Sequence, residues 1–137
     1  MKDKVIKMPK ERDLKLDEYD ISWRRYRELK YFCMQYNEKK EKIKSIVGLS
    51  AVNYSGTPGA KGVFHSQTET QAIKIAGLRN DIKLIDDTAM EADSTIYKQL
   101  LENITDGVPY EYLQVPCGRR QFYRARRKFF YLLSQKR

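Results

Sequence analysis

Apolar residues recur at alternating intervals of three and four positions through the first third of the chain. The repeat consists of Tyr26, Leu29, Cys33, Tyr36, Lys40, Ile43 and Val47, with one lysine among its members. This spacing aligns the repeat along one face of a helix, as in the seam of a coiled coil. It predicts a helix that begins near Ile21, with Asp20 as its N-cap, and ends at Gly48. The solvated face of this helix is expected to carry Glu38, Lys39, Glu41 and Lys42.

A second repeat with the same spacing follows, and it consists of Ile75, Leu78, Ile82, Ile85, Ala89, Ala92 and Ile96. The intervening residues 48–65 contain four glycines and one proline, a composition that predicts a loop. Ser66 and Glu69 have the spacing of a capping box, so we expect the second helix to begin at Ser66. Two seams joined by a loop predict an antiparallel helical hairpin or a dimeric coiled coil.

The rest of the chain has the pattern of shorter helices. The stretch Asp93–Thr95 favours caps over helix interior and predicts a break, followed by a short helix through Ile104. Asp106–Gly107 predicts a turn, and the proline that opens Pro109–Gln114 suits the first turn of another short helix. We therefore predict an all-α fold made of a mobile segment at residues 1–18, a long helical hairpin at 19–92 with its glycine-rich loop at 48–65, and a helix-turn-helix module at 93–137.

The stretch from Pro109 onward has the order short helix, tight turn, longer helix, with Gly118 at the N-cap of the longer one. A stripe predicted to be buried in the longer helix consists of Phe122, Ala125, Phe129 and Leu132. Another face carries Arg120, Tyr123, Arg127 and Tyr131. An apolar stripe backed by an arginine and tyrosine face, directly after a turn, is typical of the recognition helix of a helix-turn-helix protein.

Positive charge is concentrated in the same helix. Residues 115–137 contain eight basic side chains and no acidic one, while the net charge of all 137 residues is +9. Such a distribution favours polyanions, and we expect double-stranded DNA as the partner. Arginine can donate two hydrogen bonds to guanine and glutamine can pair with adenine, whereas other cations neutralise phosphates. The predicted DNA-binding residues are Arg119, Arg120, Gln121, Tyr123, Arg124, Arg127 and Lys128.

Two stretches, YDISWRRYRELKYFCMQYNEKKEKI at 19–43 and VPYEYLQVPCGRRQFYRARRKFFYLLSQKR at 108–137, resemble a known family. They are similar to the RinA- and ArpU-type regulators of late gene transcription in phages and prophages of Gram-positive bacteria. The most specific part is RRQFYRARRKFFYLL at 119–133. The resemblance implies a helix-turn-helix like that of sigma factor region 4 and sequence-specific regulation of transcription in the bacterial cytoplasm. The helical hairpin is then expected to serve as a module for homodimerisation or for contact with RNA polymerase.

A DNA-packaging protein is the alternative to a transcription regulator. Small terminase-like subunits that recognise packaging DNA also join a helix-turn-helix to helical hairpins. Oligomeric state separates the two functions, because a ring of roughly eight or more subunits favours packaging and a monomer or dimer favours regulation.

Other classes of function are disfavoured by the composition. The single histidine, His65, and the two separate cysteines, Cys33 and Cys117, have no metal-ligand spacing, so we expect no metal, no cofactor and no enzymatic activity. No apolar run approaches the roughly 20 residues that span a membrane. The aromatic residues of the basic helix fit a core stripe and no lipid-anchor motif accompanies them, so no membrane partner is expected. Residues 85–106 contain several carboxylates, which we interpret as a solvated helix face or as partners of the basic tail: Asp86, Asp87, Glu91, Asp93, Glu102 and Asp106.

Overall fold

The computed structural model describes the backbone of residues 21–54 and 61–137 and the side chains of residues 21–48 and 68–137. Helix dominates these ranges, and no strand occurs within them. The predicted all-α fold class is therefore confirmed. The segment expected to be mobile, residues 1–18, and the predicted cap Asp20 both lie outside the described residues.

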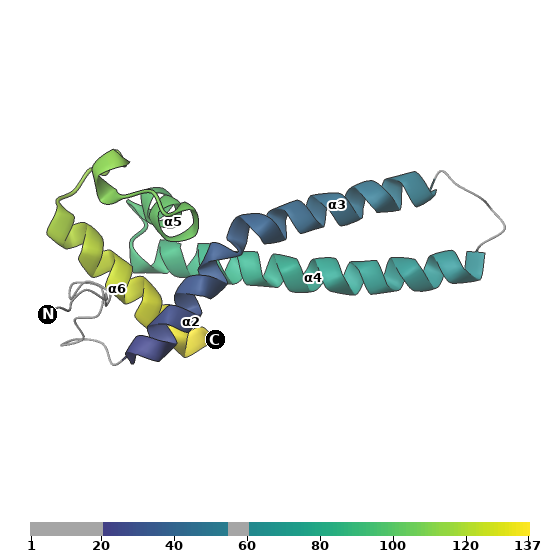
Figure 1. Cartoon of the computed structure of the whole chain (residues 1–137), viewed down its shortest axis with the longest axis horizontal. Helices are drawn as coiled ribbons and strands as arrows, with labels where there is room; N and C mark the ends of the chain where they lie inside the picture. The colour runs from purple at the N-terminus through teal and green to yellow at the C-terminus, as the bar shows by residue number, and fades with distance from the viewer. Residues whose placement is uncertain (1–20, 55–60) are drawn as a thin grey trace, which may run out of the picture. The chain divides into compact units, whose positions relative to one another are not determined.

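The elements follow the order α2 (Trp23–Met34), α3 (Tyr36–Tyr54), α4 (Lys61–Ala92), α5 (Tyr97–Asp106), the single 3-10 turn η2 (Tyr110–Tyr112) and α6 (Arg119–Lys136) (Figure 1). They divide into two compact units. The first unit contains the residues up to Met34 together with Leu84–Arg137, and the second unit contains Gln35–Lys83. Helix α4 contributes to both, since the boundary falls within it.

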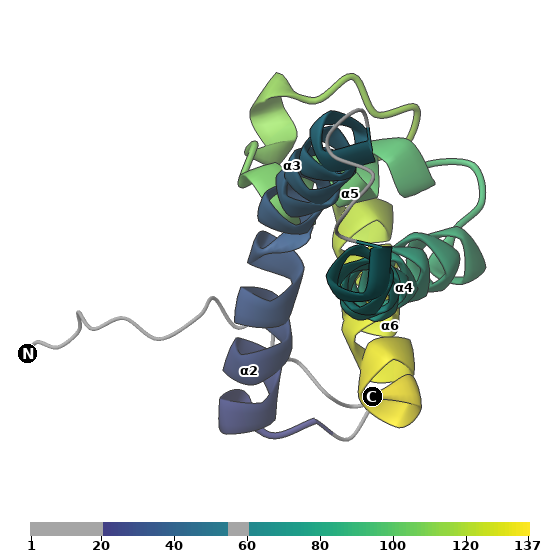
Figure 2. The same cartoon turned by 90° about the vertical axis from the view of Figure 1, so that its right-hand side faces the viewer.

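The first unit has an apolar core formed by α2, α5, α6 and the end of α4. Each helix turns one stripe inward, because 3.6 residues per turn bring positions three and four apart to the same face. Helices α2 and α6 lie side by side in Figure 2, and the rings of Tyr26 and Phe130 meet edge to face with centroids 4.9 Å apart. The buried apolar side chains of this core include Tyr26, Leu29, Phe32, Cys33, Ile85, Ala89, Ala92, Ile96, Leu100, Ile104, Phe122, Ala125, Phe129, Phe130 and Leu133.

One charged side chain, Arg126, is buried in this core with 7% of its surface exposed. Its Nε donates a hydrogen bond of 2.8 Å to Asn103 Oδ1 on α5, and its Nη1 donates one of 3.1 Å to the Tyr26 hydroxyl on α2. The guanidinium also lies 5.1 Å from the centroid of the Phe130 ring, a favourable cation–π contact. The Tyr26 ring stacks in turn on Trp23, with centroids 6.0 Å apart. Arg126 therefore links α6 to both α2 and α5.

The predicted continuous helix from Ile21 to Val47 is interrupted. Gln35 forms a turn between α2 and α3, although the sequence has no glycine or proline there. The interruption coincides with the boundary between the two units. The hydroxyl of Ser22 accepts a 3.1 Å hydrogen bond from the backbone N–H of Arg25, so Ser22 caps α2.

The predicted boundaries of the next two helices are wrong. Helix α3 continues through Gly48 to Tyr54, and α4 already begins at Lys61, so Ser66 lies inside a helix and cannot start a capping box. Most of the predicted loop at 48–65 is therefore helical, and residues 55–60 lie outside the described residues. A glycine costs a helix interior only about 1 kcal/mol relative to alanine, which is too little to end a helix by itself.

The break predicted at Asp93–Thr95 is confirmed. Helix α4 ends at Ala92, and Asp93 Oδ1 accepts hydrogen bonds from the backbone N–H of Thr95 at 2.9 Å and from its hydroxyl at 2.6 Å. The turn predicted at Asp106–Gly107 is also present. Gly107 adopts a left-handed conformation with φ of 74° and ends α5, a position that disfavours residues with a Cβ.

The short helix predicted at Pro109–Gln114 is reduced to η2, one 3-10 turn. Pro109, before this turn, and Leu113, after it, both have an extended backbone conformation. The hydroxyl of Tyr110 donates a 2.8 Å hydrogen bond to the carbonyl of Cys117, which holds the turn against the start of α6. The connection between α5 and α6 is thus longer than the three or four residues typical of a helix-turn-helix.

Few of the described side chains of the second unit are buried. Lys39, which was predicted to be solvated, is 8% exposed, and its Nζ forms an ion pair of 2.9 Å with Asp81 Oδ2 on α4. Lys40, which stands in the predicted seam, is instead exposed and lies 4.4 Å from the centroid of the Tyr36 ring. The apolar seam positions here are only half-buried at Ile43, Ile75, Leu78 and Ile82, and Val47 is exposed.

Replacing Arg126 by methionine tests its role in the first unit. Methionine preserves much of the side-chain length but leaves Asn103 Oδ1 and the Tyr26 hydroxyl without this donor, so we expect a loss of about 2 kcal/mol in the free energy of unfolding. Denaturant unfolding followed by circular dichroism measures it. The matched control is Arg124→Met, two positions earlier and exposed, which should change stability by less than about 0.5 kcal/mol. Equal stability of the two variants would contradict the role of Arg126.

Candidate nucleic-acid interface

Helix α6 supplies most of the candidate interface. Its predicted buried stripe is confirmed at Phe122, Ala125 and Phe129, whereas Leu132 is only half-buried. Gly118 precedes the helix in an extended conformation, and no side chain caps the N-terminus. The first backbone N–H groups of α6 consequently add positive potential beside its exposed arginines.

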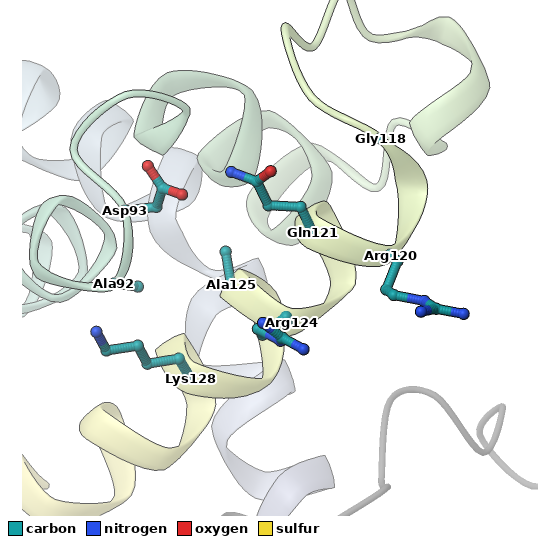
Figure 3. Close-up of a pocket in the computed structure, with 8 residues that line it drawn as sticks. All are labelled: Ala92, Asp93, Gly118, Arg120, Gln121, Arg124, Ala125 and Lys128. Atoms are coloured by element: carbon teal, nitrogen blue, oxygen red, sulfur yellow. The ribbon is translucent and has the colours of Figure 1, made fainter.

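The exposed face of α6 borders a pocket of about 680 Å³ in the first unit. The end of α4 and the residue after it form the opposite wall, so two elements distant in the sequence meet there (Figure 3). The pocket is lined by Ala92, Asp93, Gly118, Arg120, Gln121, Arg124, Ala125 and Lys128. Four of the seven predicted DNA-binding residues are therefore brought together at one concave surface.

The three cations of this pocket form a row along α6. Arg120, Arg124 and Lys128 are spaced four residues apart, which places successive members on one face about 6 Å apart along the helix axis. All three side chains are exposed, and none of them forms an ion pair with another described residue. Their charges are available to an external anion.

Asp93 gives the pocket its one carboxylate. The hydrogen bond from the Thr95 hydroxyl lowers the pKa of this carboxyl below its usual value. Burial opposes this shift in part, and backbone N–H groups and the amide of Gln121 add smaller contributions to it. Figure 3 shows the Gln121 amide turned toward Asp93 across the pocket. Asp93 is therefore ionised at neutral pH and fixed in position by its own hydrogen bonds.

Arg119 and Tyr123, two other predicted DNA-binding residues, face η2 instead of the pocket. Arg119 forms an ion pair of 3.0 Å with Glu111, and its guanidinium lies 4.9 Å from the centroid of the Tyr110 ring. The hydrogen bond to Glu111 raises the pKa of Arg119 further above its usual value. The ring of Tyr123 lies 6.4 Å from that of Tyr110. Both residues attach η2 to α6.

Arg127, the last predicted DNA-binding residue, is half-buried and does not line the pocket. Asp93 was not among the predicted DNA-binding residues, because its sequence context indicated a helix break and, with five other carboxylates, a solvated face or a partner of the basic tail. The hypothesis that carboxylates of residues 85–106 oppose the basic tail is supported at two positions. Asp93 shares the pocket with the cations of α6, and Glu91 forms an ion pair of 2.6 Å with Lys136.

The chain was compared with protein-family models, with curated proteins and with solved structures, and none of these matches it. Among the side chains of residues 21–48 and 68–137, no cluster of three or more histidine, cysteine, aspartate or glutamate residues could hold a metal ion. No helix in the described part of the chain is long and apolar enough to cross a membrane.

The pKa of Asp93 gives a test of this geometry. Thr95→Ala removes the hydroxyl that chiefly lowers this pKa, so the pKa should rise toward 3.8. Because the pKa of Asp93 is lower in the folded state than in the unfolded chain, the ionised carboxylate stabilises the fold at pH values above the unfolded-state pKa. This stabilisation is lost as the pH falls through the folded-state pKa. We expect Thr95→Ala to reduce the loss in the free energy of unfolding that accompanies the protonation of Asp93 at low pH. Carboxyl ¹³C NMR titration of Asp93 measures the pKa directly.

The control for this titration is Thr105→Ala. The Thr105 hydroxyl donates to the carbonyl of Leu101 at 2.7 Å and has no contact with Asp93, so its removal should leave the Asp93 titration unchanged. A wild-type titration midpoint in Thr95→Ala would contradict the assigned cause.

Proposed function

We propose that this protein is a sequence-specific DNA-binding regulator of phage or prophage transcription that contacts double-stranded DNA through α6. The observation that carries the proposal is the row of three exposed cations, Arg120, Arg124 and Lys128, without ion-pair partners among the described residues and beside Gln121 on one concave surface. A helix with one buried apolar stripe and one basic face can enter the major groove while its inner face stays anchored.

The two ends of the row are assigned different contacts. The N-terminal turn of a recognition helix usually meets base edges, and later turns approach the backbone. Arg120 and Gln121 occupy the first turn of α6, so we assign them to bases. Lys128 lies two turns further on and is assigned to phosphate. Arg119 and Tyr123 become supports of η2 rather than direct DNA contacts.

The arrangement of α5, η2 and α6 supports a variant of the helix-turn-helix. Helix α5 takes the place of the first helix, and the connection Gly107–Gly118 contains η2 as an extra turn. Asn103 on α5 reinforces the arrangement, since its Nδ2 donates to the carbonyl of Val108 at 2.8 Å while its Oδ1 accepts from Arg126. The resemblance of 108–137 to the RinA- and ArpU-type regulators agrees with this assignment.

We assign the second unit to a helical hairpin that mediates self-association or contact with RNA polymerase. The Lys39–Asp81 ion pair joins α3 to α4, and the half-buried Ile43, Leu78 and Ile82 leave apolar surface for a second copy. Analytical ultracentrifugation of the purified protein measures its oligomeric state. A monomer or dimer agrees with a regulator, whereas a ring of roughly eight or more subunits would favour the packaging subunit.

Binding titrations at several salt concentrations test the assignment of α6. Arg120→Ala should cost roughly 1–3 kcal/mol on the preferred site and relax selection at one or two base positions. Lys128→Ala should weaken binding about equally on all sequences and reduce the salt slope by about 1. The measurement is fluorescence anisotropy on matched and scrambled duplexes.

Lys42→Ala is the control for these titrations. It removes the same charge from an exposed position of α3, outside the pocket, and should leave both affinity and salt slope unchanged. If Arg120→Ala and Lys128→Ala bound both duplexes as the wild type does, α6 would not be the DNA-binding element.

A further inference from the structure

The negative charge of Asp93 is unfavourable in a surface that binds only phosphates. Asp93 is the single carboxylate among the residues that line the pocket, and three cations of α6 line the same pocket. A carboxylate repels the phosphate oxygens that those cations attract, so it weakens non-specific binding to the DNA backbone. Its presence therefore calls for a ligand group other than phosphate.

Hydrogen bonds within the chain fix the position of the Asp93 carboxylate. Two hydrogen bonds from Thr95 converge on Asp93 Oδ1, at 2.9 Å from the backbone N–H and 2.6 Å from the hydroxyl. Asp93 forms no ion pair with a cation of the described residues, so its charge is not neutralised within the chain. Oδ2 takes no part in these two bonds. Because an ionised carboxylate has about four acceptor sites, it can accept a hydrogen bond from a ligand in addition to those from the chain.

Gln121 extends the same acceptor surface. Figure 3 shows the amide nitrogen of Gln121 on the side of Asp93 and the amide oxygen on the other side. This oxygen can accept a hydrogen bond from a ligand, beside the N–H donors of the same amide. Asp93 and Gln121 together thus offer acceptors in a pocket whose other polar groups, on Arg120, Arg124 and Lys128, are all donors.

Exocyclic amines are the hydrogen-bond donors that bases present in the major groove, at N4 of cytosine and N6 of adenine. Carboxylates pair characteristically with cytosine N4, since one amine donor meets one acceptor, whereas adenine is usually read by an amide that both donates and accepts. We infer that Asp93 is a specificity-determining residue, which accepts a hydrogen bond from the N4 amine of a cytosine in the bound DNA.

This inference rests on the proposed function, and it adds a base contact from outside α6. Asp93 lies between α4 and α5, so the predicted recognition helix alone does not contain the full set of base-reading groups. The cations of α6 then bind and orient the duplex. The carboxylate rejects bases that present an acceptor at the same point, because two acceptors repel each other.

Selection of bound sites from a random duplex pool by the full-length protein tests the inference. Asp93→Asn is nearly isosteric and keeps an oxygen acceptor for Thr95, but it replaces the other oxygen by an N–H₂ donor. At one position we expect the cytosine preferred by the wild type to lose about tenfold in selection, with guanine or thymine gaining. Affinity for scrambled DNA should rise at the same time, since a repulsive charge is removed.

Glu102→Gln is the matched control, because it removes the same charge from an exposed position of α5 outside the pocket. It should select the wild-type motif. If Asp93→Asn also selected the wild-type motif, or lost affinity equally for every base, Asp93 would be only a helix-ending residue and the inference would be overturned while the proposed function stood. A wild-type protein that selected no motif would overturn both.

Discussion

The direction of the exposed basic face of α6 depends on the hydrogen bonds of one buried guanidinium. Apolar packing is non-directional, so the rings of Phe122, Phe129 and Phe130 alone would leave α6 some freedom to rotate about its axis. Arg126 removes that freedom by bonding to Asn103 on α5 and Tyr26 on α2. Positions two residues away point roughly 160° from it, because successive residues are rotated by about 100°. Fixing Arg126 inward thus turns Arg124 and Lys128 outward.

The sequence predicted the helical class, the break after Ala92, the turn at Gly107 and three of four positions in the buried stripe of α6. It did not predict the burial of Lys39 and Arg126, because charged side chains are usually solvated and were expected to be so here. A signal was present at α6, where Phe122, Arg126, Phe129 and Leu133 step by four, three and four. No comparable signal identified Lys39, whose burial depends on Asp81, 42 residues further along the chain.

Long-range contacts also explain what the sequence could not predict about the site. The pocket joins α6 to Asp93, more than 25 residues earlier, and no local pattern encodes that meeting. Arg119 and Tyr123 belong to the same arginine- and tyrosine-rich stretch as the residues that line the pocket, yet they contact Glu111 and Tyr110 instead. Only the backbone path of the α5–α6 connection, with its short 3-10 turn, brings these partners within reach.

The fluorescence of Trp23 reports on the first unit alone. Trp23 is the single tryptophan of the 137 residues, and its ring stacks on Tyr26, whose hydroxyl accepts the Arg126 hydrogen bond. The Arg27 guanidinium lies 5.0 Å from the centroid of the indole ring. Intrinsic fluorescence excited in the indole band therefore monitors the attachment of α2 to α6. The second unit has no indole of its own, so unfolding confined to it is separated spectroscopically from unfolding of the first.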